Sequence, residues 1–220
     1  MNVQEATTRR LPDLKGRYLP ENCRETINTI LKETYGYEQF RNLEIYDDLS
    51  KGKEKLCISQ GQLIENVILE AEKAWKGETQ VDNILLTAPT GSGKSLLFQL
   101  PAIYLGKEYN LLTIVVSPLK ALIVDQVESL QELGYMRVAY ASSDLSPEQK
   151  MEVYRQVREG EIDLFYLSPE LLLSYDIKHF VGERRIGLVV VDEAHTVTTW
   201  GKEFRVDYWF LGRYLGALKQ

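Results

Sequence analysis

The stretch Leu85–Leu96, which reads LLTAPTGSGKSL, constrains the fold of this chain more than any other. A short apolar run at 83–86 predicts a buried strand, which ends before Pro89. A tight glycine turn follows, and Lys94 and Ser95 open an apolar helix. A strand, a turn and a helix N-terminus together form an anion cradle, because unpartnered backbone N–H groups and the helix dipole both favour negative charge there.

The residues of this loop predict a nucleotide phosphate as the anion. Glycine at positions 91 and 93 lets the backbone curl and approach phosphates closely. Lys94 supplies a charge to the β- and γ-phosphates, and the Ser95 hydroxyl is a magnesium ligand. Ala88 departs from the general pattern, which has Gly there, and the alternative is a Gly/Ser turn before Lys-Ser by chance. The predicted nucleotide-binding residues of the loop are Pro89, Thr90, Gly91, Ser92, Gly93, Lys94 and Ser95.

An acidic segment, Asp192-Glu193-Ala194-His195, directly follows the apolar run 188–191. An Asp at a strand end can hold magnesium, and the next Glu can position or deprotonate the attacking water. His195 can link this site to a neighbouring segment. The alternative is a strand end made soluble by charge. Together with the phosphate loop, the segment predicts an ATPase that uses ATP and Mg²⁺, with Ser95 and Asp192 as metal ligands. The predicted catalytic residues are Lys94, Asp192, Glu193 and His195.

Between and around these motifs, strands alternate with helices. Further strands are predicted at 111–117, 136–141, 163–168 and 186–191, and helices at 21–35, 62–76, 120–133 and 147–159. The strands are apolar on both faces, which predicts an α/β fold with a parallel sheet covered on both sides. The carboxyl ends of such strands meet at one edge, where ligands bind. No element is predicted for 42–59.

Composition limits the possible environments and partners. The chain has 220 residues, 44% of them apolar, with a formal charge of -6. No apolar run approaches the ~20 residues of a membrane span, and the N-terminus lacks a secretion signal, so we expect a cytoplasmic protein without a membrane partner. Cys23 and Cys57 lack metal-ligand spacing. An acidic chain of this kind would bind nucleic acid through a local groove rather than its mean field.

The motifs resemble those of RecQ-like superfamily 2 helicases, over about 35–41 and 60–212. APTGSGKS and DEAH resemble motifs I and II. The aromatic-rich segment 194–208 is the most branch-specific match. The other matching segments are YGYEQFR at 35–41 (motif 0), VSPLKALIVDQ at 116–126 (motif Ia), LSPEL at 167–171 (motif Ib) and AHTVTTWGKEFRVDY at 194–208 (the aromatic-rich loop).

The resemblance implies a P-loop NTPase lobe of RecA-like fold at 61–220, behind an N-terminal helical extension at 1–60. It also implies site residues at matching positions. Those facing the adenine are Tyr37, Arg41 and Gln62. Those sensing single-stranded DNA are Trp200, Phe204 and Arg205. Those contacting DNA from motifs Ia and Ib are Ser117, Lys120, Gln126 and Ser168.

The chain departs from the family pattern in three places. Glu44 stands where motif 0 has its glutamine, so 42–60 is interpreted as an insertion before Gln62. The aromatic loop has Lys202-Glu203 for His-Asp and Val206 for Pro. Finally, motif III, expected on an interior strand, and the second RecA-like lobe are missing. A sheet without an interior strand has unpaired backbone groups, so we expect a fragment of a longer protein.

The sequence therefore predicts an ATP-dependent DNA helicase or translocase, represented by its ATP-binding lobe. Two alternatives stay open. The chain could be a non-catalytic ATP- or DNA-binding module, because a hydrolysis site between two lobes is incomplete with one. It could also be an RNA helicase, or a translocase of a defence system, from the same superfamily.

Overall fold

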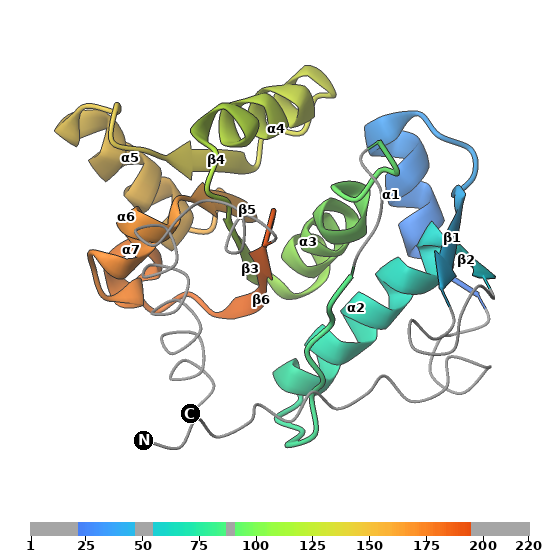
Figure 1. Ribbon diagram of the computed structural model, residues 1–220. Coiled ribbons are helices and arrows are strands. Elements are labelled where there is room, and N and C mark those ends of the chain that lie inside the picture. Colours follow the sequence, from blue (N-terminus) through green and yellow to red (C-terminus); the bar gives the residue numbers. More distant parts are fainter. Residues whose placement is uncertain (1–21, 47–54, 87–90, 195–220) are drawn as a thin grey trace, which may run out of the picture.

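Four parallel strands form the centre of the computed structural model, which describes residues 22–46, 55–86 and 91–194 (Figure 1). The strands are β3 (Leu112–Val116), β4 (Val138–Ala141), β5 (Leu164–Leu167) and β6 (Ile186–Val191). Their order in the sheet is β4-β5-β3-β6, and every pairing is parallel. The predicted α/β fold with a parallel sheet is confirmed, with strand ends within two residues of those expected.

Strand β3 shows why both faces of the sheet are covered. Leu112, Ile114 and Val116 belong to one apolar cluster, whereas Val115 belongs to another on the opposite face. Side chains alternate across a strand, so a strand with apolar residues on both faces needs helices on both sides. Five-residue β3 is buried throughout, and its core position fixes the layers around it.

The helices divide between the two faces (Figure 1). The cluster that contains Val115 joins the sheet to α1–α4, and the cluster that contains Leu112, Ile114 and Val116 joins it to α5–α7. Helix α3 contacts β3, β5 and β6 on one side and α1 and α2 on the other. The helices are α1 (Glu25–Tyr35), α2 (Gln60–Trp75), α3 (Leu96–Tyr109), α4 (Lys120–Glu132), α5 (Pro147–Arg158), α6 (Pro169–Leu173) and α7 (Ile177–Val181). Within the described ranges, no helix has the length and apolar character needed to cross a membrane.

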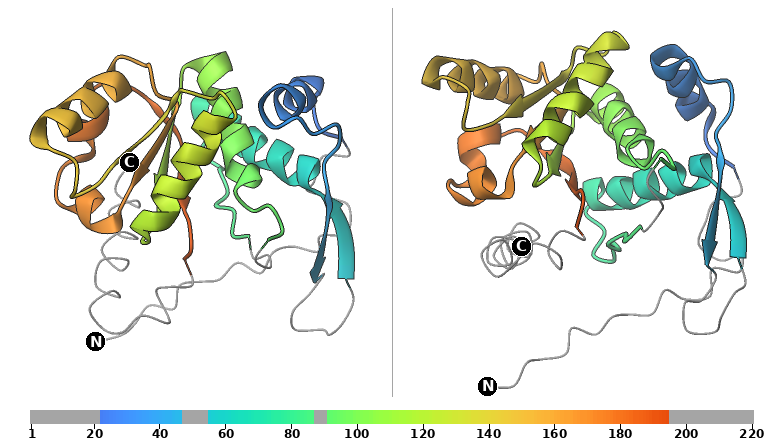
Figure 2. Two further views of the ribbon diagram at one scale, coloured as in Figure 1. Left: turned by 90° about the horizontal axis from the view of Figure 1, so that it is seen from above. Right: turned by 45° about the horizontal axis from the view of Figure 1, so that its top comes forward.

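The segment 42–59, for which no element was predicted, forms an antiparallel hairpin. Its strands are β1 (Asn42–Tyr46) and β2 (Lys55–Ser59). The hairpin adjoins the N-terminal end of α2, away from the central sheet (Figure 2). Only Leu43 and Ile58 of its described side chains are buried, so the apolar alternation is too weak to predict strands from sequence.

The segment 83–86 was predicted as a strand, and this prediction is wrong. Residues 81–86 have no regular secondary structure, and the side chains of Ile84 and Leu85 are 42% and 75% exposed. A strand needs a partner whose backbone groups complete its ladder. Among the described residues, β6 pairs only with β3, and a cleft separates its other side from 81–86. The apolar run is therefore present without the pairing that would make it a strand.

A buried ionic cluster attaches the N-terminal helix to this layer. Arg24, which precedes α1, contacts Glu65 at 2.6 Å and Glu72 at 2.7 Å, both on α2. Tyr104 of α3 lies under the guanidinium, 4.8 Å from ring centroid to Cζ. Tyr109 donates to Glu72 at 2.9 Å. The two carboxylates are almost fully buried, and the positive charge of Arg24 compensates their negative charge.

Replacing Arg24 with Met should lower the free energy of unfolding by about 3 kcal/mol, since it strands two buried carboxylates. This would lower the midpoint of thermal unfolding by roughly 10 °C. The matched control is Lys32→Met, whose partner Glu38 is 72% exposed, and which should change stability by less than ~1 kcal/mol. Equal effects of the two substitutions on stability would contradict the role of Arg24 in compensating the two buried carboxylates.

The same pair predicts a pH dependence. Burial acts to raise the pKa of Glu72, but hydrogen bonds from Arg24 and Tyr109 and the charge of Arg24 outweigh it and lower that pKa from its ordinary value of 4.5. A group with a lowered folded pKa stabilises the fold above its unfolded pKa, and this stability is lost as the pH falls through the folded value. The stability difference between wild type and Arg24→Met should therefore narrow as the pH falls below 4.5.

Candidate functional site

The described part of the phosphate loop, residues 91–95, runs directly into the N-terminus of α3. Gly91 and Gly93 have φ of 80° and 77°, in the left-handed region that favours glycine. The N–H of Leu96 donates to the Gly93 carbonyl at 3.2 Å, and Ser95 is the N-cap of the helix. The loop therefore ends where the unpartnered N–H groups and the positive end of the α3 dipole lie, as predicted.

Gln60, the first residue of α2, forms hydrogen bonds with the backbone of the phosphate loop. Its Nε2 donates to the carbonyl of Ser92 at 3.0 Å and of Gly93 at 3.4 Å. Its Oε1 accepts from the N–H of Arg41 at 3.2 Å, and its own N–H donates to the Arg41 carbonyl at 2.9 Å. In a trans peptide the C=O and N–H point in opposite directions. With these carbonyls directed at Gln60, the N–H groups that follow them point away from it.

Gln62, the glutamine predicted to face the adenine, has a structural contact. Its Oε1 accepts from the N–H of Ser59 at 3.1 Å, which completes a capping box at the start of α2. The pattern Ser-x-x-Gln is a sequence signal for this box. This signal was available in the sequence and identifies Gln62 as the capping glutamine. The contact of Gln60 with the phosphate loop was not predicted from the sequence.

The acidic pair lies at the carboxyl end of β6. The N–H of Asp192 donates to the Val116 carbonyl at 2.9 Å and so extends the ladder with β3. The Asp192 Oδ1 accepts from the N–H of Glu193 at 2.9 Å. Glu193 has φ of 49°, which is rare for a residue with a side chain and costs about 1–3 kcal/mol. Strain of this kind concentrates at functional sites.

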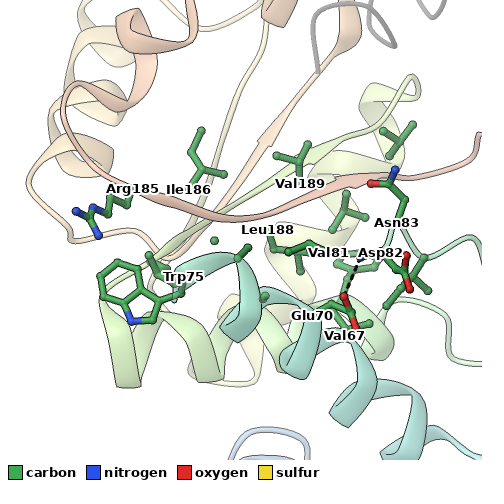
Figure 3. A pocket seen from close by; sticks show the side chains of 18 of the residues that line it. Val67, Glu70, Trp75, Val81, Asp82, Asn83, Arg185, Ile186, Leu188 and Val189 are labelled. Carbon is green, nitrogen blue, oxygen red and sulfur yellow. Dashed lines mark hydrogen bonds between the residues drawn. The ribbon is translucent and has the colours of Figure 1, made fainter. Parts of the chain in front are cut away.

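One cleft joins the loop to the acidic pair. Its volume is about 1570 Å³, and Lys94, Asp192 and Glu193 all line it. Apolar side chains from α2, from 81–86 and from β6 form its walls, among them Val67, Val81, Leu188 and Val189 (Figure 3). The structure therefore brings together the lysine and the two carboxylates that the sequence predicted to act on one nucleotide.

The residues present fit a nucleotide phosphate with magnesium. The hydroxyl of Ser92 is buried in the loop and has no hydrogen-bond partner among the described residues. Ser95 offers a hydroxyl oxygen and Asp192 a carboxylate, which are ligand types that Mg²⁺ prefers. The described residues contain no group of three or more His, Cys, Asp and Glu that could hold a metal. Mg²⁺ does not need one, since it takes one or two protein ligands and completes its shell with water and phosphate.

A hydrogen-bonded group of side chains supports Ser95 from within. Gln126 of α4 donates from Nε2 to the Ser95 Oγ at 2.9 Å. Tyr166 of β5 donates to Gln126 Oε1 at 3.2 Å. Burial raises the pKa of the Tyr166 phenol well above its ordinary value, and the charge of Asp192 adds a smaller increase. This phenol therefore stays protonated and can donate to Gln126.

The predicted adenine contacts lie at the exit of α1. Tyr37 is 51% exposed and stacks on Tyr35, with ring centroids 6.3 Å apart. Arg41 is exposed, and its backbone is bonded to Gln60 as described. Arg41 is therefore connected to the phosphate loop through Gln60, while the contact of both residues with adenine stays a prediction.

The predicted DNA contacts of motifs Ia and Ib follow β3 and β5. Ser117 is only 1% exposed, and Ser168 is the N-cap of α6, where its Oγ accepts from the N–H of Leu171. Lys120, at the start of α4, is exposed and forms an ion pair with Asp144. Gln126 points its amide toward Ser95. Their role in DNA binding stays a prediction. The predicted residues that lie outside the described part of the chain are Pro89, Thr90, His195, Trp200, Phe204 and Arg205.

The contact between Gln60 and the loop predicts a coupling with Gly93. An added Cβ at Gly93 would lie 2.7 Å from Gln60 Nε2, whereas at Gly91 nothing lies within 4 Å. Both positions have a positive φ, so either Ala substitution should cost about 1–2 kcal/mol. Gly93→Ala should cost more than Gly91→Ala, and the excess should disappear in a Gln60→Ala background. Denaturant unfolding of these variants checks this, and an unchanged excess would refute the contact.

Comparison with known proteins identifies the family. Residues 63–215 match the DEAD/DEAH box helicase family. The ATP-dependent DNA helicase RecQ of Synechocystis sp. is 34% identical over 199 residues, which cover 90% of this chain and 34% of that protein. The RecQ helicase of Bacillus subtilis is 32% identical over 82% of this chain and 25% of that protein.

Among solved structures, a crystal structure of the DUF1998 helicase MrfA bound to DNA and AMPPNP is similar, with a TM-score of 0.48 and 23% identity over 82% of this chain and 22% of that chain. The chain thus spans between a quarter and about a third of the length of the two RecQ proteins. The family match covers most of the chain, and the curated relatives lie in one branch. The chain belongs to the DEAD/DEAH box helicase family and is a RecQ-like superfamily 2 helicase lobe with a RecA-like α/β fold.

Proposed function

We propose that this chain is the ATP-binding lobe of an ATP-dependent DNA helicase or translocase. The observation that carries the proposal is the common cleft of Lys94, Asp192 and Glu193, beside the N-terminus of α3. Phosphoryl transfer needs positioning and charge neutralisation more than covalent chemistry. A lysine, a helix N-terminus and two carboxylates in one cleft supply what that reaction requires.

Each residue has a role in this proposal. The loop N–H groups that point away from Gln60 bind phosphate oxygens, and Lys94 neutralises charge on the β- and γ-phosphates. Ser95 and Asp192 hold Mg²⁺, which when bound neutralises charge developing on the phosphate oxygens. Glu193 orients the attacking water and accepts its proton. The left-handed backbone conformation of Glu193 is the kind of strain found at functional sites, which supports this role.

DNA is the proposed polymer partner. The relatives carry the name ATP-dependent DNA helicase, which supports DNA over RNA. The acidic chain, with a net charge of -6, favours a local contact surface. That surface comprises Lys120 and Ser168 at the carboxyl edge of the sheet and, from the family pattern, Trp200, Phe204 and Arg205, whose rings and guanidinium would stack on bases. The rest of the relatives' length would contribute the second lobe that closes over the γ-phosphate.

Lys94→Ala should lower the affinity of the 220-residue chain for Mg·ATP roughly 10- to 100-fold, because a charge-assisted contact with phosphate is lost. Equilibrium binding of a fluorescent ATP analogue measures it. The control is Lys107→Ala, at the opposite end of α3, where Lys107 pairs at 3.9 Å with the exposed Glu33. Wild-type affinity in Lys94→Ala would refute the proposed phosphate site.

Glu193→Gln should separate binding from hydrolysis. The amide keeps the size of the side chain but cannot accept the proton of water, so turnover should fall about 10²- to 10⁴-fold while affinity stays near wild type. The measurement is nucleic-acid-stimulated ATP hydrolysis by the protein expressed from its complete reading frame. Undiminished turnover would contradict the role of Glu193. Stimulation by RNA alone would favour an RNA helicase instead.

A further inference from the structure

Three side chains form a continuous chain of hydrogen bonds that ends on Ser95. The Tyr35 hydroxyl, on α1, donates to Gln99 Oε1 at 2.9 Å. Gln99 Nε2, on α3, donates to Gln126 Oε1 at 2.9 Å. Gln126 Nε2, on α4, donates to Ser95 Oγ at 2.9 Å. Tyr166 of β5 also bonds to the two glutamines in the middle of this hydrogen-bond chain. It donates to Gln126 Oε1 at 3.2 Å and accepts from Gln99 Nε2 at 3.3 Å.

The direction of this chain is set at its far end. Burial raises the pKa of Tyr35 far above its ordinary value, so its hydroxyl keeps its proton and can donate it. A donated hydrogen bond needs the oxygen of Gln99, and this turns the amide nitrogen of Gln99 toward Gln126. The same logic turns the oxygen of Gln126 inward and its nitrogen toward Ser95. With Tyr35 as the donor at the far end, both amides point their nitrogens toward the loop, and Gln126 meets Ser95 as a donor.

A donor on Ser95 decides which parts of the hydroxyl stay available. The serine oxygen has two lone pairs and one hydrogen. Gln126 occupies one lone pair, which leaves the other for a metal ion and the hydrogen for a phosphate oxygen. Without Gln126 the hydroxyl can rotate. Gln99, which is only 5% exposed, would also lose an acceptor for its amide.

We propose that Gln126 is a positioning residue for the Ser95 hydroxyl, which it orients so that one lone pair of Ser95 faces the magnesium ion bound with the nucleotide. This inference deepens the proposed function and rests on it. It gives Gln126 a role on the nucleotide side of the sheet edge, different from the DNA contact expected from its motif. It also connects the loop to α4, whose first residue is Lys120.

The test is a Mg²⁺ titration of the binding of a fluorescent ATP analogue to the 220-residue chain. Gln126→Met keeps the length of the side chain and removes the donor. It should raise the Mg²⁺ concentration at half-saturation about two- to tenfold, as expected for one lost hydrogen bond. The affinity for the analogue in excess EDTA should not change, because no metal ion is then present for the oriented Ser95 hydroxyl to bind. A general structural defect would lower both affinities.

A double-substitution cycle assigns the effect to Ser95. In a Ser95→Ala background, Gln126→Met should cause no further shift, since there is no hydroxyl to orient. Tyr35→Phe, two hydrogen bonds away from Gln126, should shift the Mg²⁺ midpoint in the same direction by a smaller factor. It also carries the test if Gln126→Met fails to fold. The matched control is Gln131→Met, an exposed glutamine of the same helix, which should leave the midpoint unchanged.

The outcomes separate this inference from the function on which it rests. A wild-type midpoint in folded Gln126→Met, or an equal shift in the Ser95→Ala background, would overturn the role of Gln126 while leaving the nucleotide site intact. If Gln126→Met does not fold, a wild-type midpoint in Tyr35→Phe would overturn it. If the wild-type chain does not bind the analogue, or binds it unchanged after Lys94→Ala, the nucleotide site itself is refuted and this inference falls with it.

Discussion

The orientation of two peptide groups, at Ser92 and Gly93, is the constraint on which the site depends. A phosphate loop has to present N–H groups to the anion, so its carbonyls need hydrogen-bond donors elsewhere. The amide of Gln60 and the first turn of α3 provide them. Gln60 is placed by the start of α2 and by the backbone of Arg41. These in turn depend on how α2 packs against α3, and the cluster around Arg24 fixes that packing. The loop is therefore held by parts of the chain far from it in sequence.

The sequence predicted the central sheet well because its physics is local. At β3, an apolar residue at almost every position can be buried only between two layers of helices, and this pattern is legible without any partner. Helix α5 is similar, since Ser146, Pro147 and Gln149 together specify its first turn. Capping and two-sided burial are properties of a few consecutive residues, so they can be predicted from them.

Features that depend on a distant partner could not be predicted in this way. The apolar run at 83–86 has the composition of a strand, but strand formation depends on a neighbouring backbone that the run itself does not specify. The hairpin at 42–59 shows the opposite case, in which mutual pairing makes strands out of a weak pattern. Gln60 and Gln126 belong to the same class. Nothing within a few residues of either indicates that its amide contacts the phosphate loop.

The buried polar contacts of this lobe differ in how much it costs to separate their partners. The carboxylates of Glu65 and Glu72 are compensated by one arginine, so any movement that separates them from Arg24 is costly. The amides of Gln99 and Gln126 are neutral, and each can exchange one partner for another at the cost of a single hydrogen bond. The ionic cluster therefore ties α1 and α2 to α3 through buried charge, whereas neutral amides link α4 to α3 and to the phosphate loop. If α4 contacts DNA as proposed, these exchangeable hydrogen bonds would link the polymer to Ser95, the proposed metal ligand.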